Sequence, residues 1–444
     1  MNPDCLLLAR WIIPVEPEGV VLKNHALVLA GGRIAAVLPR DAALADYPDL
    51  PTEVFDQHAL IPGLINAHSH AAMNLLRGVA DDLPLMDWLQ NHIWPLESRW
   101  VGEAFVRDGT DLALAEMLRG GVTCCNDMYF FPDVFARRAL RAGVRAAVGL
   151  ILIDFPSAWA GTADEYFTKG LALRDELRGE PLLHPVFAPH APYTVSDASL
   201  RRVGVLAGEL DLPIHMHLHE TRDEVDQGLK THGMRPLQRL EQLELLSPQF
   251  IGVHMTQLDD AEIARYGEFG ASAVHCPESN LKLASGFCPV AKLLGAGINV
   301  ALGTDGAASN NDLDMLGEMR TAALLAKAVA GDARAVPART ALRMATLNGA
   351  KALGLESETG SLAPGKSADI AAIRLDALET QPLFDPISQI VYAAGREHVT
   401  DVWVAGRRLL RQRELTTLDE ADLLERARHW REKLVSSFSP RDPA

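Results

Sequence analysis

The feature that most constrains the fold is an alternation of short apolar runs with helical patterns through the middle of the chain. Eight apolar runs, each long enough for one buried strand, are separated by stretches with helical spacing. One such stretch, residues 111–119, is apolar on one face and is followed by two glycines, as helix C-termini prefer. Alternation of this kind is typical of βα units around a parallel sheet. The eight runs cover residues 60–67, 121–125, 146–153, 182–188, 212–218, 250–254, 271–275 and 298–303.

The number of units distinguishes an open sheet from a closed barrel. Eight βα units predict a (β/α)8 barrel of the TIM type, in which chemistry takes place at the carboxyl ends of the strands. Shorter β-type runs flank this segment, over residues 28–38, 368–375 and 398–408. We therefore predict an α/β protein with a catalytic barrel over residues 58–368. Residues 1–57 and 369–444 are predicted to form one small, discontinuous, β-sandwich-like domain.

The balance of charged residues excludes several classes of partner. The chain has 444 residues, 58 of them acidic and 42 Lys or Arg, which gives a formal charge of −16. A surface of this charge repels phosphate backbones and anionic lipid headgroups, so we expect no nucleic-acid or membrane partner. The five cysteines form no C-x-x-C pair, which favours reduced thiols over disulfides. Without a signal-type segment or a long apolar run, the protein is expected to be cytoplasmic.

Histidines and one carboxylate occupy the ends of three predicted strands. His68 and His70 are two residues apart, so both side chains can point into the mouth of the barrel. Three more histidines alternate along residues 214–219, and Asp305 follows the last strand. Three imidazoles and one carboxylate at one mouth suit a zinc-like divalent ion with a position left for water. The alternative, in which hydrogen bonds within the core satisfy each histidine, requires a separate coincidence at each strand end.

Three segments that carry these residues resemble the amidohydrolase superfamily. They are Pro62-Gly-Leu-Ile-Asn-Ala-His-Ser-His70, His217-Leu-His-Glu220 and Gly303-Thr-Asp-Gly306. More narrowly, the chain resembles the 5′-methylthioadenosine/S-adenosylhomocysteine deaminases over nearly its whole length. The motifs that carry this narrower resemblance lie at residues 73–83, 94–97, 188–193 and 303–315.

The resemblance implies a role for each polar residue of the site. Glu220 transfers protons, while Asp305 both ligates the metal and takes the proton of the attacking water, and both also contact the substrate. The set implied for one metal ion is His68, His70, His217 and Asp305. The other implied site residues are His254, which orients the attacking hydroxide, Glu97, which holds the ribose hydroxyls, and His190, a second substrate contact.

The implied reaction is hydrolytic deamination of an adenosine-type nucleoside to the inosine analogue and ammonia. Hydroxide held by the metal attacks the ring, because a bound divalent metal lowers the pKa of water from about 15.7 to roughly 7. Glu220 then protonates a ring nitrogen and later the departing amine. Zinc is the first expectation for the metal, with iron(II) or manganese(II) as alternatives, because nitrogen and oxygen ligands accept all three.

Other residues of the strand ends stay open at this point. Spacing along the fifth strand does not select the ligand, and only the resemblance selects His217. His215 is expected to be a hydrogen-bonded core residue, whereas His219 is either a core residue or a substrate contact. His275 has no implied ligand role. Trp88 either packs against the bound base or belongs to the core.

Missing residues narrow the choice of enzyme and substrate. The fourth predicted strand has no lysine to bridge two metals, so one metal is expected. The chain also lacks the P-C-x-x-C of other zinc deaminases and the H-E-x-x-H of metalloproteases. Residues 146–173 contain no arginine, and Lys169 is their only cation. Relatives that accept S-adenosylhomocysteine use an arginine in this region, so we expect 5′-methylthioadenosine first, adenosine second and S-adenosylhomocysteine third.

Two alternative functions remain. A related enzyme acting on a free-base (oxo)purine, cytosine or s-triazine ring would share the same ligand set. A catalytically inactive barrel that serves as a binding protein would have lost a ligand or the proton-transferring residue, and neither is missing here. The expected partner is a small-molecule nucleoside. Enzymes of this kind are often symmetric homo-oligomers, an assembly that the sequence leaves open.

Overall fold

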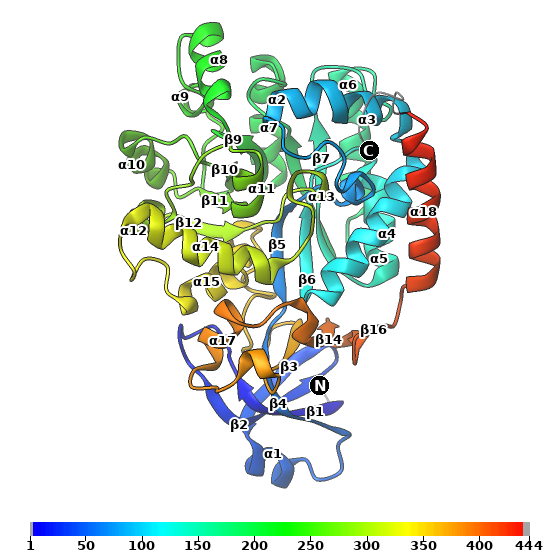
Figure 1. Cartoon of the computed structure of the whole chain (residues 1–444), viewed down its shortest axis with the longest axis vertical. Helices are drawn as coiled ribbons and strands as arrows, with labels where there is room; N and C mark the ends of the chain where they lie inside the picture. The colour runs from blue at the N-terminus through cyan, green and yellow to red at the C-terminus, as the bar shows by residue number, and fades with distance from the viewer. Residues whose placement is uncertain (1–2, 438–444) are drawn as a thin grey trace. The chain divides into compact units, whose positions relative to one another are not determined.

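The computed structural model describes residues 3–437 and contains two eight-stranded sheets (Figure 1). In the first sheet each strand pairs with the next along the chain, in the order β12-β11-β10-β9-β8-β7-β6-β5. This parallel arrangement confirms the predicted βα barrel. Its strands are β5 (Leu64–Ser69), β6 (Val122–Asp127), β7 (Arg145–Leu152), β8 (Leu183–Pro189), β9 (Ile214–Leu218), β10 (Phe250–His254), β11 (Ser272–His275) and β12 (Asn299–Leu302).

Contacts between the first and last strands nearly close the ring. A parallel bridge joins Ser69 to Asp305, and the N–H of Asp305 donates to the carbonyl of His68 at 3.1 Å. Gly303 permits this approach, because a Cβ on it would lie only 2.8 Å from the backbone nitrogen of His68. The closure places His68 and Asp305 side by side.

The predicted first strand differs from the structure in an informative way. The apolar run 60–67 contains the end of one strand and most of another. Residues as far as Pro62 belong to β4 (Thr52–Pro62) of the second sheet, and the barrel strand begins at Leu64. Gly63, between the two strands, donates its N–H to the carbonyl of Asp369 at 3.0 Å. Because both strands are buried, the apolar run continues through the junction and hides the change of sheet.

Helices alternate with the barrel strands, and several start at the residues that favour helix N-termini. The side chains of Thr162, Ser196 and Thr221 each accept the N–H three residues ahead. The predicted helix 111–119 is the second half of a longer helix. The helices of this region are α4 (Glu103–Arg119), α5 (Pro132–Ala142), α6 (Ala163–Glu176), α7 (Asp197–Leu210), α8 (Arg222–His232), α9 (Pro236–Gln242), α10 (Asp260–Glu268), α11 (Pro277–Lys282), α12 (Val290–Gly295), α13 (Ala307–Asn310), α14 (Met315–Ala330), α15 (Ala338–Met344) and α16 (Leu347–Ala352).

The long connection after β5 contributes a wall of short helices. Its apolar side chains, among them Trp88 and Ile93, are buried in one cluster with Phe105 of α4 and Trp430 near the C-terminus. Trp430 lies on α18 (Glu420–Val435) and donates its ring N–H to Asp108 at 2.9 Å. The last helix therefore packs against α4. The short helices are η1 (Ala71–Leu76), α2 (Leu85–Trp88), η2 (Leu89–Ile93) and α3 (Trp94–Trp100).

The β-type segments of both chain ends pair into the second sheet. Its order is β16-β15-β14-β13-β4-β1-β2-β3. The predicted hairpin is present: Gly31 and Gly32 turn between β2 and β3 with φ values of 55° and 78°. A Cβ on Gly32 would lie 2.5 Å from the carbonyl oxygen of Ala405, so this turn requires glycine. The remaining elements are β1 (Cys5–Ile12), β2 (Leu22–Ala30), β3 (Arg33–Pro39), α1 (Arg40–Asp46), β13 (Ile370–Arg374), η3 (Leu378–Thr380), α17 (Pro386–Tyr392), η4 (Arg396–His398), β14 (Val399–Val404), β15 (Arg407–Arg411) and β16 (Glu414–Leu415).

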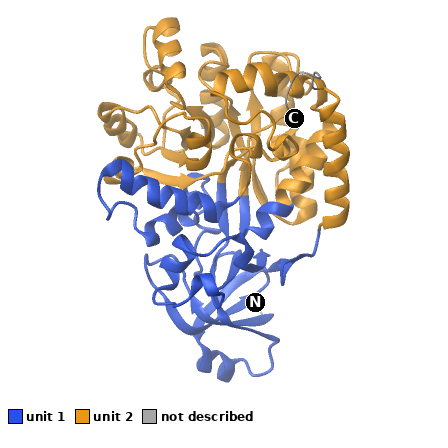
Figure 2. Cartoon of the chain, in the orientation of Figure 1, with its two compact units in different colours: residues 1–66, 115–124, 314–417 blue, residues 67–114, 125–313, 418–444 orange. Residues whose placement is uncertain are grey.

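The chain divides into two compact units, coloured separately in Figure 2. The first contains residues up to 66, 115–124 and 314–417, and the second contains 67–114, 125–313 and the chain from 418 onward. The predicted domain boundaries at 57/58 and 368/369 remain a prediction, and residues 1–2 and 438–444 of the predicted small domain lie outside the described residues. Between residues 3 and 437, no helix is both long and apolar enough to cross a membrane.

Candidate active site

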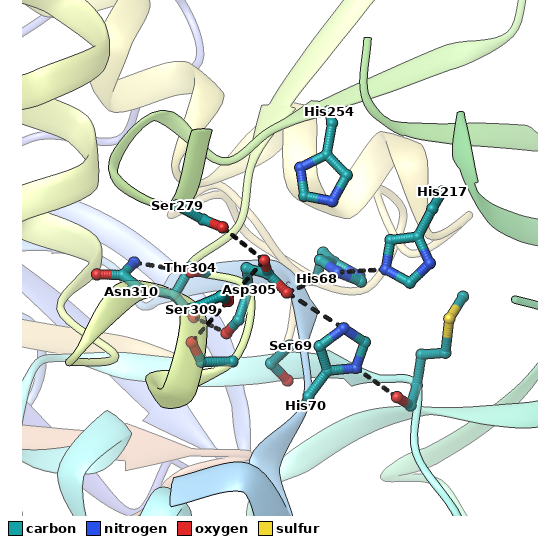
Figure 3. Close-up of polar contacts among 12 residues, drawn as sticks. His68, Ser69, His70, His217, His254, Ser279, Thr304, Asp305, Ser309 and Asn310 are labelled. Atoms are coloured by element: carbon teal, nitrogen blue, oxygen red, sulfur yellow. Dashed lines mark hydrogen bonds and ion pairs between the residues drawn. The ribbon is translucent and has the colours of Figure 1, made fainter. Parts of the chain in front are cut away.

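Four side chains from the ends of β5, β9 and β12 bring their donor atoms together (Figure 3). The Nε2 atoms of His68 and His70 lie 3.3 and 3.1 Å from Oδ1 of Asp305. The Nε2 atom of His217 lies 3.2 Å from Nε2 of His68. The parallel register explains the meeting, because the carboxyl ends of all barrel strands open at one mouth.

The other ring nitrogens of these histidines have partners that fix their orientation. Nδ1 of His70 lies 2.5 Å from the carbonyl oxygen of Met128, and Nδ1 of His217 lies 2.7 Å from that of His190. A carbonyl oxygen only accepts, so each Nδ1 donates its proton there, which leaves each Nε2 as the nitrogen that could bind a metal. Backbone partners of this kind are typical of metal-ligating histidines.

The donor set fits one divalent metal ion. The Nε2 atoms of His68 and His217 face each other at 3.2 Å. Ligands of one tetrahedral zinc, each about 2.0–2.1 Å from the metal, lie roughly 3.3–3.4 Å from one another. The distances of 3.1–3.3 Å to Asp305 are close to that value. His68, His70, His217 and Asp305 are therefore the residues that could hold the ion.

Burial and local charge keep most of these ligands in the form that a metal needs. Burial lowers the pKa of His68 to about 4 and that of His217 well below its ordinary value, so both rings are neutral. Burial alone would raise the pKa of Asp305, but the hydrogen bonds from His68 and His70 outweigh it and hold that pKa well below its usual range. Asp305 also accepts from the hydroxyls of Ser279 at 2.6 Å and Ser309 at 2.8 Å.

Glu220 and His254 face each other above the ligand set. Oε2 of Glu220 lies 3.8 Å from Nε2 of His254, and the side chain of His254 is fixed through Nδ1 by the side-chain oxygen of Asn280 at 2.9 Å. The rings of His254 and His217 are stacked with their centroids 5.4 Å apart. Burial raises the pKa of Glu220, which favours the protonated carboxyl group that a proton donor needs.

A cavity of about 530 Å³ opens over these residues. Glu97 lies in its wall, where its Oε1 accepts the hydroxyl of Tyr129 at 2.5 Å. Burial raises the pKa of Glu97 to about 7, although Tyr129 and the charge of His70 act in the opposite direction. His190 also lines the cavity, with its Nδ1 3.0 Å from the hydroxyl of Thr194. The predicted site residues thus meet around one cavity, apart from His68, which is fully buried beneath it.

Most of the cavity wall away from the ligands is apolar. Among the residues 3–437 that line it, none is Lys or Arg; the ionisable side chains there are His, Glu, Asp and Tyr. Trp88 both lines the cavity and belongs to the buried apolar cluster, so its two predicted roles are not exclusive. The apolar lining residues include Leu85, Trp88, Leu89, Ile93, Trp94, Phe130, Ile153, Phe155 and Leu283.

The remaining strand-end histidines lie outside this cavity. Nε2 of His215 lies 3.1 Å from Nδ1 of His68, one layer deeper than the ligands, as the sequence predicts for a core histidine. The sequence leaves His219 open between a core residue and a substrate contact; the side chain does not touch the cavity, and its Nε2 accepts the N–H of Leu237 at 3.1 Å. Since His219 has φ of 54°, the alternation of β9 stops before it and the ring turns away. His275 is 1% exposed and is not among the cavity residues.

Three residues that hold the side chains of the site in place were not predicted from the sequence. Ser279 and Asn280, on α11, bind Asp305 and His254, and Tyr129 binds Glu97. These residues lie soon after β6 and β11, at the carboxyl ends of barrel strands, where site residues gather. Their spacing in the sequence does not reveal which side chains they bind.

Comparison with known proteins agrees with this arrangement. A model of the amidohydrolase family matches residues 59–409. The 5-methylthioadenosine/S-adenosylhomocysteine deaminase of Teredinibacter turnerae is 52% identical over 431 residues, which cover 97% of this chain and 98% of that protein. The crystal structure of an adenosine deaminase from Xanthomonas campestris with bound zinc has a TM-score of 0.95 and 55% identity, and the match covers 98% of this chain and 99% of that one.

A more distant structure shares the fold alone. Atrazine chlorohydrolase from Arthrobacter aurescens, in complex with zinc, has a TM-score of 0.89 at 23% identity, and the match covers 96% of this chain and 99% of that one.

Proposed function

The chain belongs to the amidohydrolase family, and from this premise we propose that His68, His70, His217 and Asp305 hold one divalent metal ion at the base of the substrate cavity. The enzyme is a metal-dependent hydrolytic deaminase of the 5′-methylthioadenosine/S-adenosylhomocysteine type. One observation carries the proposed site: a single cavity joins the donor set, the proton-transferring Glu220 and a carboxylate suited to ribose.

Each polar residue of the cavity has its own role in the proposed reaction. When bound, a divalent metal lowers the pKa of water to about 7 and so supplies hydroxide near neutral pH. Asp305 accepts a proton from the attacking water. His254, whose Nε2 faces Glu220, hydrogen-bonds the nucleophile and orients it. Glu220 donates its proton to the ring nitrogen next to the amine-bearing carbon. It then takes the proton of the new hydroxyl group as the carbonyl forms and passes it to the departing amine, and the proton that Asp305 took from water restores Glu220. Glu97 accepts the two ribose hydroxyls and His190 contacts the base.

The cavity supports an order among the three nucleosides. We place 5′-methylthioadenosine first, adenosine second and S-adenosylhomocysteine third. The carboxylate of a homocysteine tail needs a cationic partner, yet the cavity residues include no Lys or Arg. Lys169, the first cation that follows the third barrel strand in the sequence, pairs instead with Glu165 on α6 at 2.7 Å. A methylthio group suits the apolar wall.

Release of ammonia from a panel of substrates tests the function. Metal-loaded enzyme is expected to turn over 5′-methylthioadenosine with a higher kcat/KM than adenosine, and adenosine with a higher value than S-adenosylhomocysteine. Adenine, guanine, cytosine and a chlorinated triazine, for which release of chloride is measured as well, serve as comparison rings and are expected to be inert. Turnover of a free base or of the triazine with silence on every nucleoside would refute the nucleoside assignment, and a reversed order would refute the argument from the lining.

Glu97 is expected to control the affinity for nucleosides, in a pH-dependent way. Glu97→Gln should raise KM for 5′-methylthioadenosine about 10–100-fold, because a hydrogen bond to a charged acceptor contributes about 1.5–3 kcal/mol. The ionised carboxylate is the form that accepts both hydroxyls, and its pKa is about 7. As pH falls through 7 the carboxyl gains a proton, so KM of the wild type should rise on the acid side while that of Glu97→Gln stays flat. An unchanged KM in the variant would place the ribose elsewhere.

Three finer points accompany this proposal. Zinc is the metal we expect first, with iron(II) or manganese(II) as alternatives, and elemental analysis of the purified protein decides among them. Five free cysteines support a reducing, cytoplasmic location. The partner is a small-molecule nucleoside, and sedimentation of the purified enzyme tests for a homo-oligomer.

A further inference from the structure

The turn that carries Glu220 has an uncommon backbone conformation. Strand β9 ends at Leu218 and α8 begins at Arg222, so Glu220 lies in a short connection. His219, directly before it, has φ of 54°, in the left-handed region that residues other than glycine seldom adopt. A turn of this kind persists only where neighbouring groups hold it.

Glu224, in the first turn of α8, supplies that hold. Its Oε1 accepts the N–H of His219 at 2.9 Å, and its Oε2 accepts the N–H of Glu220 at 2.7 Å. On the opposite side, the hydroxyl of Thr256 donates to the carbonyl of Glu220 at 2.6 Å. Both backbone polar groups of Glu220 are therefore tied, and Glu224 itself is only 5% exposed.

We propose that Glu224 is a positioning residue for the deamination, which fixes the turn between β9 and α8 so that the carboxyl of Glu220 reaches the reacting atoms. The inference rests on the proposed function, because it takes Glu220 as the group that transfers the proton. Glu224 does not touch substrate. It acts through the backbone of Glu220, so its effect should fall on the proton-transfer step, and metal binding and ribose binding depend on other residues.

An ordinary helix cap is the alternative explanation, and the chain contains a matched example. In α6, the hydroxyl of Thr162 accepts the N–H of Glu165 at 3.2 Å, and Oε2 of Glu165 accepts the N–H of Gly161 at 2.8 Å. Thr221 and Glu224 repeat this pattern three residues apart. Glu165, however, is exposed and binds the backbone of one residue through one oxygen, whereas Glu224 is buried and binds two. Glu165→Gln is thus a matched control: it makes the same substitution, yet the amide keeps the one acceptor oxygen that the N–H of Gly161 needs.

The experiment is a double-variant cycle on Glu224 and Glu220, with kcat, KM and metal content measured for 5′-methylthioadenosine. Glu224→Gln, which has one acceptor oxygen instead of two, should lower kcat about 10–100-fold, because small misplacement of a reacting group has effects of this size. KM and metal content should stay within about twofold, and Glu165→Gln should behave like the wild type. Adding Glu224→Gln to Glu220→Gln should lower kcat further by less than about threefold, because Glu224 acts through a carboxyl group that is already removed.

Measurements across a range of pH give a second readout. The carboxylate is the form with two acceptor oxygens, and burial raises the pKa of Glu224 to about 8 while the two N–H groups lower it. The comparison therefore runs from about pH 6 to about pH 9, and the loss in Glu224→Gln should be largest at the alkaline end, where the wild-type carboxyl is ionised. Should Glu224→Gln fail to fold, Glu224→Asp keeps the charge, is too short to reach both N–H groups, and should show the same loss of kcat.

Three results would overturn the inference. They are wild-type kcat in Glu224→Gln, a loss of kcat that only follows a loss of metal content, and a loss that multiplies in full when it is combined with Glu220→Gln. Failure of the proposed function would appear elsewhere, as an inactive wild type or an active Glu220→Gln, so the two failures are distinguishable.

Discussion

Glu220→Gln is expected to lower kcat for 5′-methylthioadenosine by about 10²–10⁴-fold, the usual contribution of general acid–base catalysis. The amide has nearly the shape of the carboxyl group but cannot give and take a proton at neutral pH. Because Glu220 faces His254 at 3.8 Å and is not one of the four residues proposed to hold the metal, the ion should stay bound. The measurement is kcat together with metal content by elemental analysis.

A surface variant controls for the change of charge. Glu209→Gln, on the exposed face of α7, makes the same substitution away from the cavity and should leave kcat and metal content unchanged. If metal-loaded Glu220→Gln retained more than about a tenth of wild-type turnover, proton transfer would have to be assigned to another residue.

His217→Ala is expected to release the metal and abolish turnover. It removes one of three nitrogen ligands, and metal affinity should fall by more than the 10–100-fold that is typical for the loss of a supporting residue. Turnover should fall by about 10³-fold or more even with added metal, because hydroxide is no longer supplied at neutral pH. Metal content after dialysis and kcat at saturating metal are the measurements.

A histidine on the same segment provides the matched control. His219→Gln removes an imidazole two residues further on, which lies outside the cavity and binds the N–H of Leu237. This variant should keep its metal through dialysis. Full metal content in His217→Ala, or equal metal loss in both variants, would refute the assignment of His217 as a ligand.

Much of this site follows from residue types and their spacing. The period of two along β5 predicts that His68 and His70 share a face, and the structure shows both beside Asp305. The separate choice of His217 over its neighbours came from family resemblance. Periodicity leaves His217 and His219 equivalent, and only the backbone angle of His219 distinguishes them.

Other features depend on contacts that no local pattern contains. Gly63 marks a change of sheet inside one apolar run, which looks like a single strand because both of its halves are buried. Tyr129 binds Glu97 across 32 residues of sequence, and α18 returns to α4 through Trp430 and Asp108, which are 322 residues apart. Burial that comes from such contacts also sets the pKa of Glu97 and Glu220.

The sequence by itself determined the barrel, the donor types and the strand ends on which they lie, because strand and helix periods and the chemistry of each side chain are local properties. Tertiary structure alone decided which nitrogen of each histidine faces the cavity and that Glu224 holds the turn of Glu220. It also decided that the wall of the cavity is largely apolar and, among the described residues, without Lys or Arg. The physical reason is that the hydrogen-bond partners and the burial of a side chain depend on residues that come from distant parts of the chain. Spacing along one strand fixes which face a side chain occupies, but not which distant residues surround it.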